Sequence, residues 1–332
     1  MTNVAIVGAT GLVGLEMREV LSRPEFKHFQ IFLFASTARP ESSVLDLSKS
    51  WSILGDCPYI LNASSGEVAE EIRAKLKPDQ ILIDNSSAFR LSPDVPLVVP
   101  EINGGQLETR PNVVANPNCT AILLCLTLNP FKEFGLQRVI VSTYQAASGA
   151  GINGLQELET QMKAIGRGEP MPAAQYFPYP LATNVFSHNT PLRPVGDIGA
   201  GYNDEEWKVI EETRKILEVR HLAISATCIR VPVRRAHTEA VTIDLKTELT
   251  LEQIREKLQT APGLKVVDDW ERNHFPMPLE AEAKDEVLVG RMRKDATLGK
   301  TFHLMLSGDQ IRKGAALNAV QILKKCMEYE VK

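Results

Sequence analysis

Short apolar runs alternate with amphipathic segments over the first 115 residues. Helical spacing of hydrophobic positions occurs at 15–21 and 68–76, and the apolar runs lie at 4–7, 31–35, 80–84, 97–99 and 113–115. Strands that alternate with helices in this way are typical of a parallel sheet covered by helices on both faces. The first part of the chain is therefore predicted to be an α/β domain.

The pattern changes after residue 119. Segments that alternate, or that are rich in β-branched residues, follow at 139–144, 223–233 and 240–245, as expected of antiparallel strands. Residues 168–204 are rich in Pro, Gly and Asn and lack periodicity, which predicts a long loop with a functional or interface role. Helical spacing returns at 205–219 and again at 311–327.

The turn after the first apolar run carries three glycines with the spacing G-x-x-G-x-x-G. Gly8 permits a tight turn, Gly11 lets the backbone approach a pyrophosphate, and Gly14 precedes the helical spacing. A helix N-terminus binds phosphate well, so the position of the triplet favours a dinucleotide site. The alternative is a strand–helix turn in which glycine serves close packing alone.

These features predict two domains. Residues 1–118 together with 312–332 are expected to form a Rossmann-type domain with a parallel sheet, to which the last helix returns. Residues 119–311 are expected to form an α+β domain with a mixed or antiparallel sheet. A chain of 332 residues is long for a single core, which agrees with this division.

The composition of the chain argues against nucleic-acid binding, membrane association and metal binding. The net charge of −4 and the absence of a Lys/Arg block argue against nucleic acid as a partner. No apolar run approaches the roughly 20 residues that cross a bilayer, so we expect no membrane partner, and the N-terminal segment is interpreted as a strand instead of a signal peptide. The five cysteines are scattered without a Cys-x-x-Cys pair, which argues against a metal site and favours a reducing cytoplasm.

Cys119 is the most informative single residue. It lies in the polar turn Asn116-Pro117-Asn118-Cys119-Thr120, and an apolar run follows at once. Asn-Pro favours a turn, and Asn118 or Thr120 could cap a helix starting there. A thiol at a helix N-terminus is favoured as thiolate, the nucleophilic form, whereas the alternative is a buried structural cysteine.

With these residues in view, the chain resembles aspartate-β-semialdehyde dehydrogenases nearly from end to end. The resemblance is carried by ordered stretches, namely VGATGLVG at 7–14, IDNSSAFR at 83–90, VPLVVPEIN at 95–103, NPNC at 116–119, STYQAASGAG at 142–151, ATCIRVPVRRAH at 226–237, LVGRMRKD at 288–295 and KGAALNAVQI at 313–322. It implies NADP-linked interconversion of aspartyl phosphate and aspartate semialdehyde, at the head of lysine, methionine and threonine biosynthesis. It also implies a homodimer or homotetramer built through residues 119–311, with a small-molecule substrate and phosphate as the other partners.

The resemblance assigns a role to each matching residue. Cys119 corresponds to the nucleophile, His237 to the acid/base residue and Gln145 to the residue that orients the substrate. The substrate-binding set comprises Arg90 and Lys208 for phosphate, Asn118 in the acyl site, Glu205 for the amine and Arg230 for the carboxylate. The cofactor-binding set comprises Gly8, Thr10, Gly11, Leu12, Val13, Ser36, Thr37, Arg39, Ser148, Gly149 and Asn318.

These residue types suit the chemistry. Arginine can hold a carboxylate through two hydrogen bonds, and two cations offset the charge of a phosphate. Glu205 and Lys208 are three residues apart in a predicted helix and can share a face. Taken singly, each has a structural alternative: a solvated helix pair for Glu205 and Lys208, a closed turn for Arg90, and strand positions for Arg230 and His237.

NADP is favoured over NAD by the end of the second strand. An acidic residue that would hold a ribose hydroxyl is absent before Glu41, and hydroxyls with Arg39 suit a 2′-phosphate. The sequence departs from the family pattern at 36–41 and at 62–66, and the segment 183–202 matches poorly. Other possibilities are a malonyl-CoA or N-acetylglutamyl-phosphate type of reductase, against which Glu205 argues, and a non-catalytic homologue, against which the intact Cys119 argues.

Overall fold

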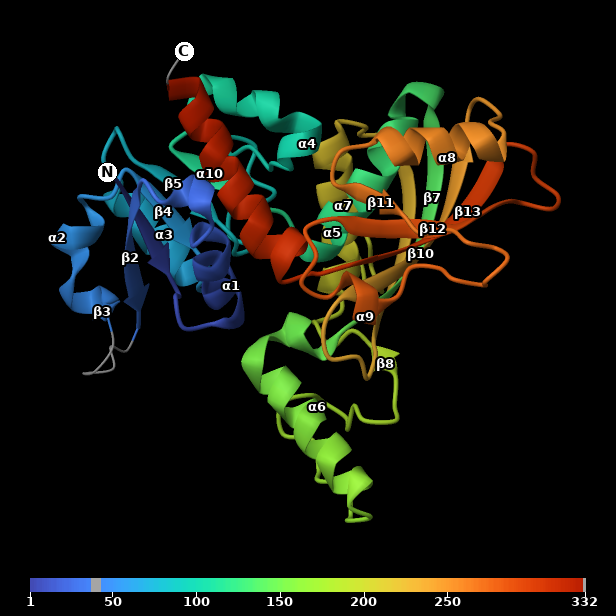
Figure 1. The fold of residues 1–332 in the computed structure, drawn as a ribbon, viewed down its shortest axis with the longest axis horizontal. Coiled ribbons are helices and arrows are strands. Elements are labelled where there is room, and N and C mark those ends of the chain that lie inside the picture. Colours follow the sequence, from blue (N-terminus) through green and yellow to red (C-terminus); the bar gives the residue numbers. More distant parts are fainter. Residues whose placement is uncertain (37–42, 331–332) are drawn as a thin grey trace. The chain divides into compact units, whose positions relative to one another are not determined.

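The computed structural model describes residues 1–36 and 43–330. The chain forms two compact units, Met1–Asn118 with Gly314–Lys332, and Cys119–Lys313 (Figure 1). The sequence analysis ended the first segment of this domain at the same residue, 118, and began its C-terminal segment at residue 312 instead of 314. Each unit has its own sheet. Within the described ranges, we find no helix with the length and apolar character needed to cross a membrane.

The first unit is built on a six-stranded parallel sheet with the order β3-β2-β1-β4-β5-β6. The strands are β1 (Thr2–Val7), β2 (Phe29–Ala35), β3 (Val44–Asp46), β4 (Tyr59–Asn62), β5 (Ile81–Asp84) and β6 (Val113–Ala115). The helices of this unit are α1 (Leu12–Leu21), α2 (Trp51–Leu54), α3 (Gly66–Lys75), α4 (Pro100–Asn103) and α10 (Leu317–Glu330). The α/β prediction with a parallel sheet is confirmed.

The core of this unit explains why the first and last helices belong together. Alternate residues of β1 and β4 pack with apolar residues of α1 and α10 in one cluster, which includes Val4, Ile6, Tyr59, Leu61, Met17, Val20, Val320 and Leu323. The intervening residues of these strands are buried as well, as expected of a parallel sheet that is covered on both faces. The C-terminal helix therefore completes a core that the first 118 residues begin.

Two local predictions in this unit were wrong. Residues 97–99 do not form a strand, because Leu97 makes only an isolated bridge to Ala115 and Pro100 then starts α4 without an N–H to donate. The closing helix does not run uniformly from 311, because residues Arg312–Ala316 form a π-helical turn before α10.

The second unit holds a seven-stranded sheet with the order β11-β12-β13-β10-β7-β9-β8. The strands are β7 (Leu136–Gln145), β8 (Phe186–Ser187), β9 (Ala223–Arg230), β10 (His237–Leu245), β11 (Leu264–Val266), β12 (Val287–Lys294) and β13 (Thr301–Gly308). The helices are α5 (Cys119–Leu128), α6 (Gly151–Gly166), α7 (Asp204–Leu217), α8 (Leu251–Thr260) and α9 (Pro278–Ala281).

This sheet is mixed, and one strand direction differs from the prediction. β10 pairs antiparallel with β7 and β13, whereas β7 and β9 are parallel. The chain returns to β9 through α6, the long loop and α7, and such a crossover gives parallel neighbours. Buried and exposed residues alternate along β7 and β9, which indicates that one face of the sheet is covered. This alternation is the same for parallel and antiparallel strands and so does not indicate the direction of a strand.

The covered face carries α5, which is apolar on all sides and buried almost throughout. Gly308 at the end of β13 allows its approach, since a Cβ there would lie 2.7 Å from a methyl group of Leu123. Residues 168–203 contain only the two-residue strand β8 and an isolated bridge between Leu192 and Asn203, and α7 begins at Asp204. The loop prediction is therefore confirmed except for its last residue. Tight packing of α5 fixes where its first residue, Cys119, lies in this unit.

Glu239 is a buried carboxyl in the middle of β10. It is fully buried, and neither carboxyl oxygen has a hydrogen-bond partner among the described residues. Burial raises its pKa well above the usual value. Its side chain is therefore kept as the uncharged acid.

We expect Glu239→Gln to raise the melting temperature at pH 7. The unfolded carboxyl ionises above a pH of about 4.5 while the folded one does not, so this group costs the native state stability as pH rises. The neutral amide removes that penalty, and the gain should vanish near pH 4.5. Thermal unfolding at several pH values checks this, and an equal effect of the substitution at pH 4.5 and 7 would contradict the assignment.

Candidate active site

Cys119 is the first residue of α5 and differs from the other cysteines in exposure. It is partly exposed, whereas the four other cysteines are buried. Its sulfur lies 4.0 Å from the hydroxyl of Thr120. Thr120 lies inside the helix and is therefore not its N-cap. The thiol thus lies at the positive end of a buried helix and remains accessible.

Gln145 joins the start of α5 to α7. It ends β7 and is almost fully buried. Its Nε2 donates to Thr120 Oγ1 at 3.1 Å and to Glu205 Oε1 at 3.3 Å. One amide therefore links the residue next to Cys119 with the predicted amine-binding carboxylate.

Glu205 and Lys208 lie in the first turns of α7. A reciprocal capping box between Asn203 and Glu206 fixes the start of this helix. Glu205 is buried, and its backbone N–H donates to Thr190 Oγ1 at 3.1 Å. Lys208 is half-buried, and the charges of both residues act on His188. The two predicted residues share one side of the helix.

Arg230 ends β9 and is 2% exposed. Its Nη1 donates to the carbonyl of Ala146 at 2.7 Å, and its Nη2 lies 2.7 Å from His188 Nε2. Within the described part of the chain, its Nε–H lacks a hydrogen-bond partner. Burial lowers its pKa, while the charges of Glu205 and of Cys119 as thiolate act in the opposite direction. The guanidinium is thus a buried cation with a donor to spare, near the cysteine.

His237 begins β10 and is fully buried. Its Nδ1 accepts the backbone N–H of Ala146 at 3.0 Å, so the neutral ring carries its proton on Nε2. That Nε2–H has no partner among the residues described. Burial, reinforced by the charge of Arg230, lowers the pKa well below its usual value. The ring is therefore an uncharged donor at neutral pH.

Gly149 brings His237 and Arg230 to one place. It lies in a short 3₁₀ turn, η5 (Ala147–Ala150), and a Cβ on it would lie 2.8 Å from His237 Cε1, 3.1 Å from Nε2 and 3.4 Å from Arg230 Nη1. Only glycine leaves both groups room. Gly149 was predicted for the cofactor, and in this unit it lies against the side chains predicted for catalysis and carboxylate binding.

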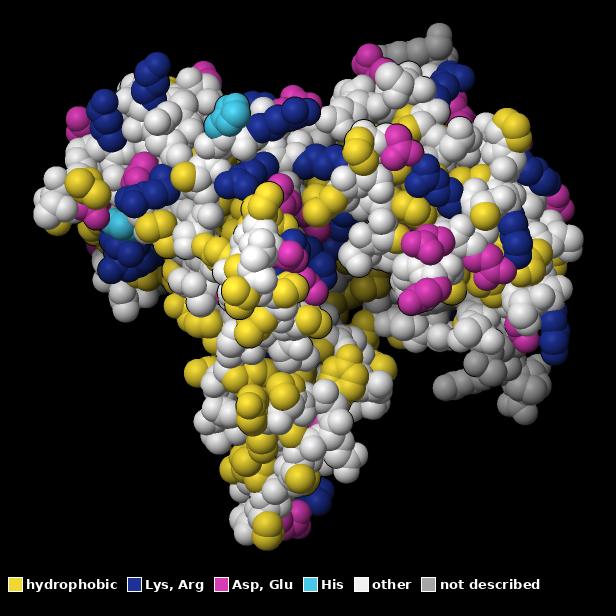
Figure 2. Space-filling view, turned by 180° about the vertical axis from the view of Figure 1, so that it is seen from behind, with side chains coloured by type: hydrophobic (Ala, Val, Ile, Leu, Met, Phe, Trp, Pro, Cys, Tyr) yellow, Lys and Arg dark blue, Asp and Glu magenta, His cyan; other side chains and the backbone are white. Residues whose placement is uncertain are grey.

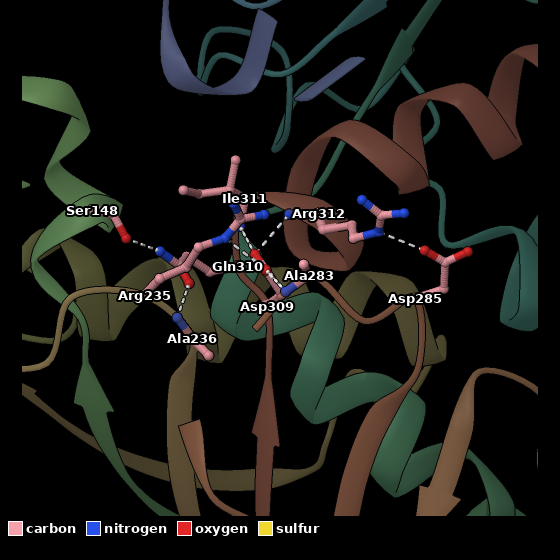
Figure 3. A network of polar contacts seen from close by, with 9 residues as sticks. All are labelled: Ser148, Arg235, Ala236, Ala283, Asp285, Asp309, Gln310, Ile311 and Arg312. Carbon is pink, nitrogen blue, oxygen red and sulfur yellow. Dashed lines mark hydrogen bonds and ion pairs between the residues drawn. The ribbon is translucent and has the colours of Figure 1, made fainter. Parts of the chain in front are cut away.

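A second set of contacts holds the backbone that leads into His237 (Figure 3). Gln310 accepts the N–H of Ala236 at 2.9 Å and donates to the hydroxyl of Ser148 at 2.7 Å. Asp309, which is fully buried, pairs with Arg235 at 2.7 Å. Ala236 has a φ of 69°, which a non-glycine residue adopts only when its surroundings hold it there. Gln310 and Asp309 are functional candidates that sequence reasoning missed.

The first unit holds the predicted phosphate turn. A Cβ at Gly8 would lie 2.6 Å from the carbonyl of Ala63, and one at Gly14 would overlap the carbonyl of Gly8. Gly11 is the N-cap of α1, which has no side-chain cap hydrogen bond among the described residues. The first N–H groups of a helix lack intrahelical acceptors, and so they suit a phosphate. Thr10 is exposed, and Leu12 and Val13 are half-buried beside this turn.

The remaining predicted residues of the first unit lie either around Asn116 or in the segment that follows β2. Arg90 donates to the carbonyls of Asn116 at 3.0 Å and Asn85 at 2.7 Å, and Asn318 donates to the side chain of Asn116 at 2.8 Å. Asn118 is buried at the end of the same segment. Ser36 is exposed after β2, while Thr37 and Arg39 lie outside the described residues.

Comparisons with known proteins agree with this architecture. Residues 3–110 match the family model "Semialdehyde dehydrogenase, NAD binding domain", and residues 128–313 match "Semialdehyde dehydrogenase, dimerisation domain". The chain is 42% identical to an aspartate-semialdehyde dehydrogenase of Synechocystis sp., over 98% of this chain and 97% of that one. It is 41% identical to the Aquifex aeolicus protein of the same name, over 96% of each chain.

A solved structure extends the likeness to the fold. The crystal structure of aspartate semialdehyde dehydrogenase II from Vibrio cholerae, complexed with ASA, has a TM-score of 0.89 and 34% sequence identity, covering 99% of this chain and 98% of that chain. Both units and the order of their elements are thus matched over nearly the full length. With the domain matches and the near-complete coverage by relatives, the chain belongs to the aspartate-semialdehyde dehydrogenase family.

Proposed function

We propose that the protein interconverts L-4-aspartyl phosphate and L-aspartate 4-semialdehyde with NADP(H), through a thioester on Cys119. One observation supports this above the others: Gln145 connects the helix start that carries Cys119 to the buried carboxylate of Glu205. A reactive thiol and a site for a charged amine are thereby parts of one arrangement. The near-full-length similarity to proteins of this name supports the same activity.

Substrate binding uses complementary charges. Arg230 takes the substrate carboxylate, which supplies the anion that its buried guanidinium needs. Glu205 takes the substrate ammonium, and Gln145 orients the acyl group with Asn118. Arg90 and Lys208 take the phosphate.

Covalent chemistry begins at sulfur. The Cys119 thiolate attacks the acyl carbon of aspartyl phosphate, the carbon–oxygen bond to phosphate breaks, and phosphate leaves with that electron pair. When bound, the nicotinamide cofactor supplies the hydride that reduces the acyl group. The backbone N–H of Cys119 stabilises the developing oxyanion, and His237, the proposed acid/base residue, donates a hydrogen bond to the reacting group from Nε2. The carbon–sulfur bond of the reduced intermediate then breaks, its electron pair returns to the sulfur of Cys119, and the aldehyde is released.

The cofactor is held in the first unit by the turn at Gly8, Gly11 and Gly14, with Thr10, Leu12 and Val13 beside it. NADP is preferred to NAD, because β2 ends at Ala35 and the sequence that follows has no acidic residue before Glu41 to bind the ribose. Thr37 and Arg39 lie outside the described residues, and their proposed role in binding the 2′-phosphate rests on the sequence alone. Ser148, Gly149 and Asn318 complete the cofactor-binding set.

A second copy of the chain is the protein partner. The match to a dimerisation domain supports self-association. Exposed apolar side chains gather on the part of the second unit that includes α6 and the start of the long loop, as Figure 2 illustrates. They comprise Ile152, Met162, Ile165, Met171, Tyr176 and Tyr179. Patches of this kind on soluble proteins mark interaction surfaces.

The test is a coupled spectrophotometric assay with the purified protein. We expect reduction of NADP that requires both aspartate semialdehyde and inorganic phosphate, with a lower kcat/KM for NAD. Replacing phosphate by coenzyme A should leave little activity, because Arg90 and Lys208 are proposed to bind phosphate. N-acetylglutamate semialdehyde should also be a poor substrate, because Glu205 is proposed to bind a free amine. Faster turnover in either replacement than with aspartate semialdehyde and phosphate would contradict the proposal.

A further inference from the structure

The long loop 168–204 contacts Arg230 through two side chains. His188 Nε2 lies 2.7 Å from Arg230 Nη2, and the ring of Phe177 lies 5.6 Å from the guanidinium carbon. A guanidinium has no acceptor, so Nη2 donates and His188 Nε2 accepts. The segment that lacked any periodicity thus packs around the residue assigned to the substrate carboxylate.

Among the described residues, the groups that accept hydrogen bonds from Arg230 are uncharged. Nη1 donates to the carbonyl of Ala146 at 2.7 Å and, at 3.5 Å, to that of Gln145, and Nη2 donates to an imidazole. Burial lowers the pKa of His188 to about 4, despite the opposing charge of Glu205, so the ring is neutral at neutral pH. Neutral acceptors fix the orientation of the guanidinium without cancelling its charge.

His188 is itself held by the start of α7. Its Nδ1 lies 3.3 Å from Thr190 Oγ1, and Thr190 also accepts the N–H of Glu205 at 3.1 Å. The hydroxyl of Thr190 lies 3.5 Å from Asn203 Oδ1, which caps the helix. With Nε2 accepting, Nδ1 carries the proton and donates to Thr190. A continuous set of hydrogen bonds therefore runs from Arg230 to the helix that carries Glu205.

We propose that His188 is a positioning residue, which orients the guanidinium of Arg230 as a neutral acceptor and so sets the preference for substrates with a carboxylate beside the amine. This inference rests on the proposed function of the same site. Thr190 transmits the fixed position of α7, so that the carboxylate-binding and amine-binding groups keep a constant spacing. A carboxylate at position 188 would pair with Arg230 and compete with the substrate.

The test compares His188→Gln, His188→Leu and His188→Glu with the wild type. Glutamine keeps a neutral acceptor and should stay within about threefold of the wild-type KM for aspartate semialdehyde. Leucine removes the acceptor and glutamate adds a competing charge, and both should raise that KM at least tenfold, with smaller changes in kcat and an unchanged KM for NADP. His221→Leu, at an exposed position before β9, is the matched control and should change neither parameter.

Two outcomes would overturn the proposal: a wild-type KM in His188→Glu, or an equal change in kcat and in the KM for NADP in all three variants. An inactive wild type would instead refute the proposed function. If the wild type is inactive, the contact between His188 and Arg230 is tested by thermal unfolding, in a double-mutant cycle with Arg230→Leu. His188→Leu should lower the melting temperature less when Arg230 is already replaced, and equal losses in both backgrounds would refute the contact.

Discussion

Replacing Cys119 by alanine should abolish phosphate-dependent NADP reduction with aspartate semialdehyde, lowering kcat by at least about 10⁴-fold. The proposed reaction passes through a bond to this sulfur, and no side chain at the start of α5 can replace it. Cys119 is partly exposed, so the smaller residue should leave the fold intact. The measurement is the coupled assay, with thermal unfolding of the same preparation. Activity near that of the wild type would refute the assignment of the nucleophile.

Alkylation gives a control that does not depend on turnover. Of the five cysteines, the four other than Cys119 are buried. Burial raises the pKa of Cys57 to about 11, and that of Cys326 to about 12, so these thiols are unreactive at neutral pH. The native protein should take up one equivalent of iodoacetamide rapidly, more slowly when substrate is present, and Cys119→Ala should take up none at that rate. Rapid labelling of a different cysteine would contradict the assignment of Cys119 as the reactive thiol.

His237→Asn should lower kcat by roughly 10²- to 10⁴-fold, with a smaller change in the KM for aspartate semialdehyde. The asparagine oxygen can still accept the N–H of Ala146, as His237 Nδ1 does, so the local backbone is retained. What is lost is the Nε2 proton, for which no described residue provides an acceptor. Steady-state kinetics with each substrate varied measures the two effects separately.

The pH dependence of folding supplies the control for this variant. The pKa of His237 is depressed in the native state, so the unfolded chain binds a proton that the folded one does not as pH falls below about 6.5. The wild type therefore loses stability below that pH, and His237→Asn should lose less. An equal loss in both proteins, or a fall in KM that matches the fall in kcat, would argue against a neutral, proton-donating histidine.

The first unit was largely predictable because its signals are local. A strand, a glycine turn and a helix follow one another at residues 2–21, and each is specified by neighbouring residues. Strands such as β4 were missed because they are short and flanked by polar loops. The direction of β9 relative to β7 could not be predicted, since the alternation of side chains is the same in both directions.

The site could be predicted only in part, for a similar reason. Cys119, Gln145, Arg230 and His237 lie in recognisable motifs, whereas their supports are distant in sequence. His188 lies in a segment without periodicity, and its contact with Arg230 joins residues 42 positions apart. Gln310 lies 162 residues from Ser148. Spacing along the chain gives no information on such contacts, and the fold alone creates them.

The contacts of Asp309 and Gln310 also bear on biosynthesis of the protein itself. These two residues hold the backbone that leads into His237, and Gln310 lies 74 residues after Ala236 in the chain. A polypeptide still growing on the ribosome has Cys119 and His237 long before it has the side chains that fix the histidine in place. The backbone before His237 therefore lacks these two supports until residues 309 and 310 have been synthesised and the last strand of the second sheet has folded against it.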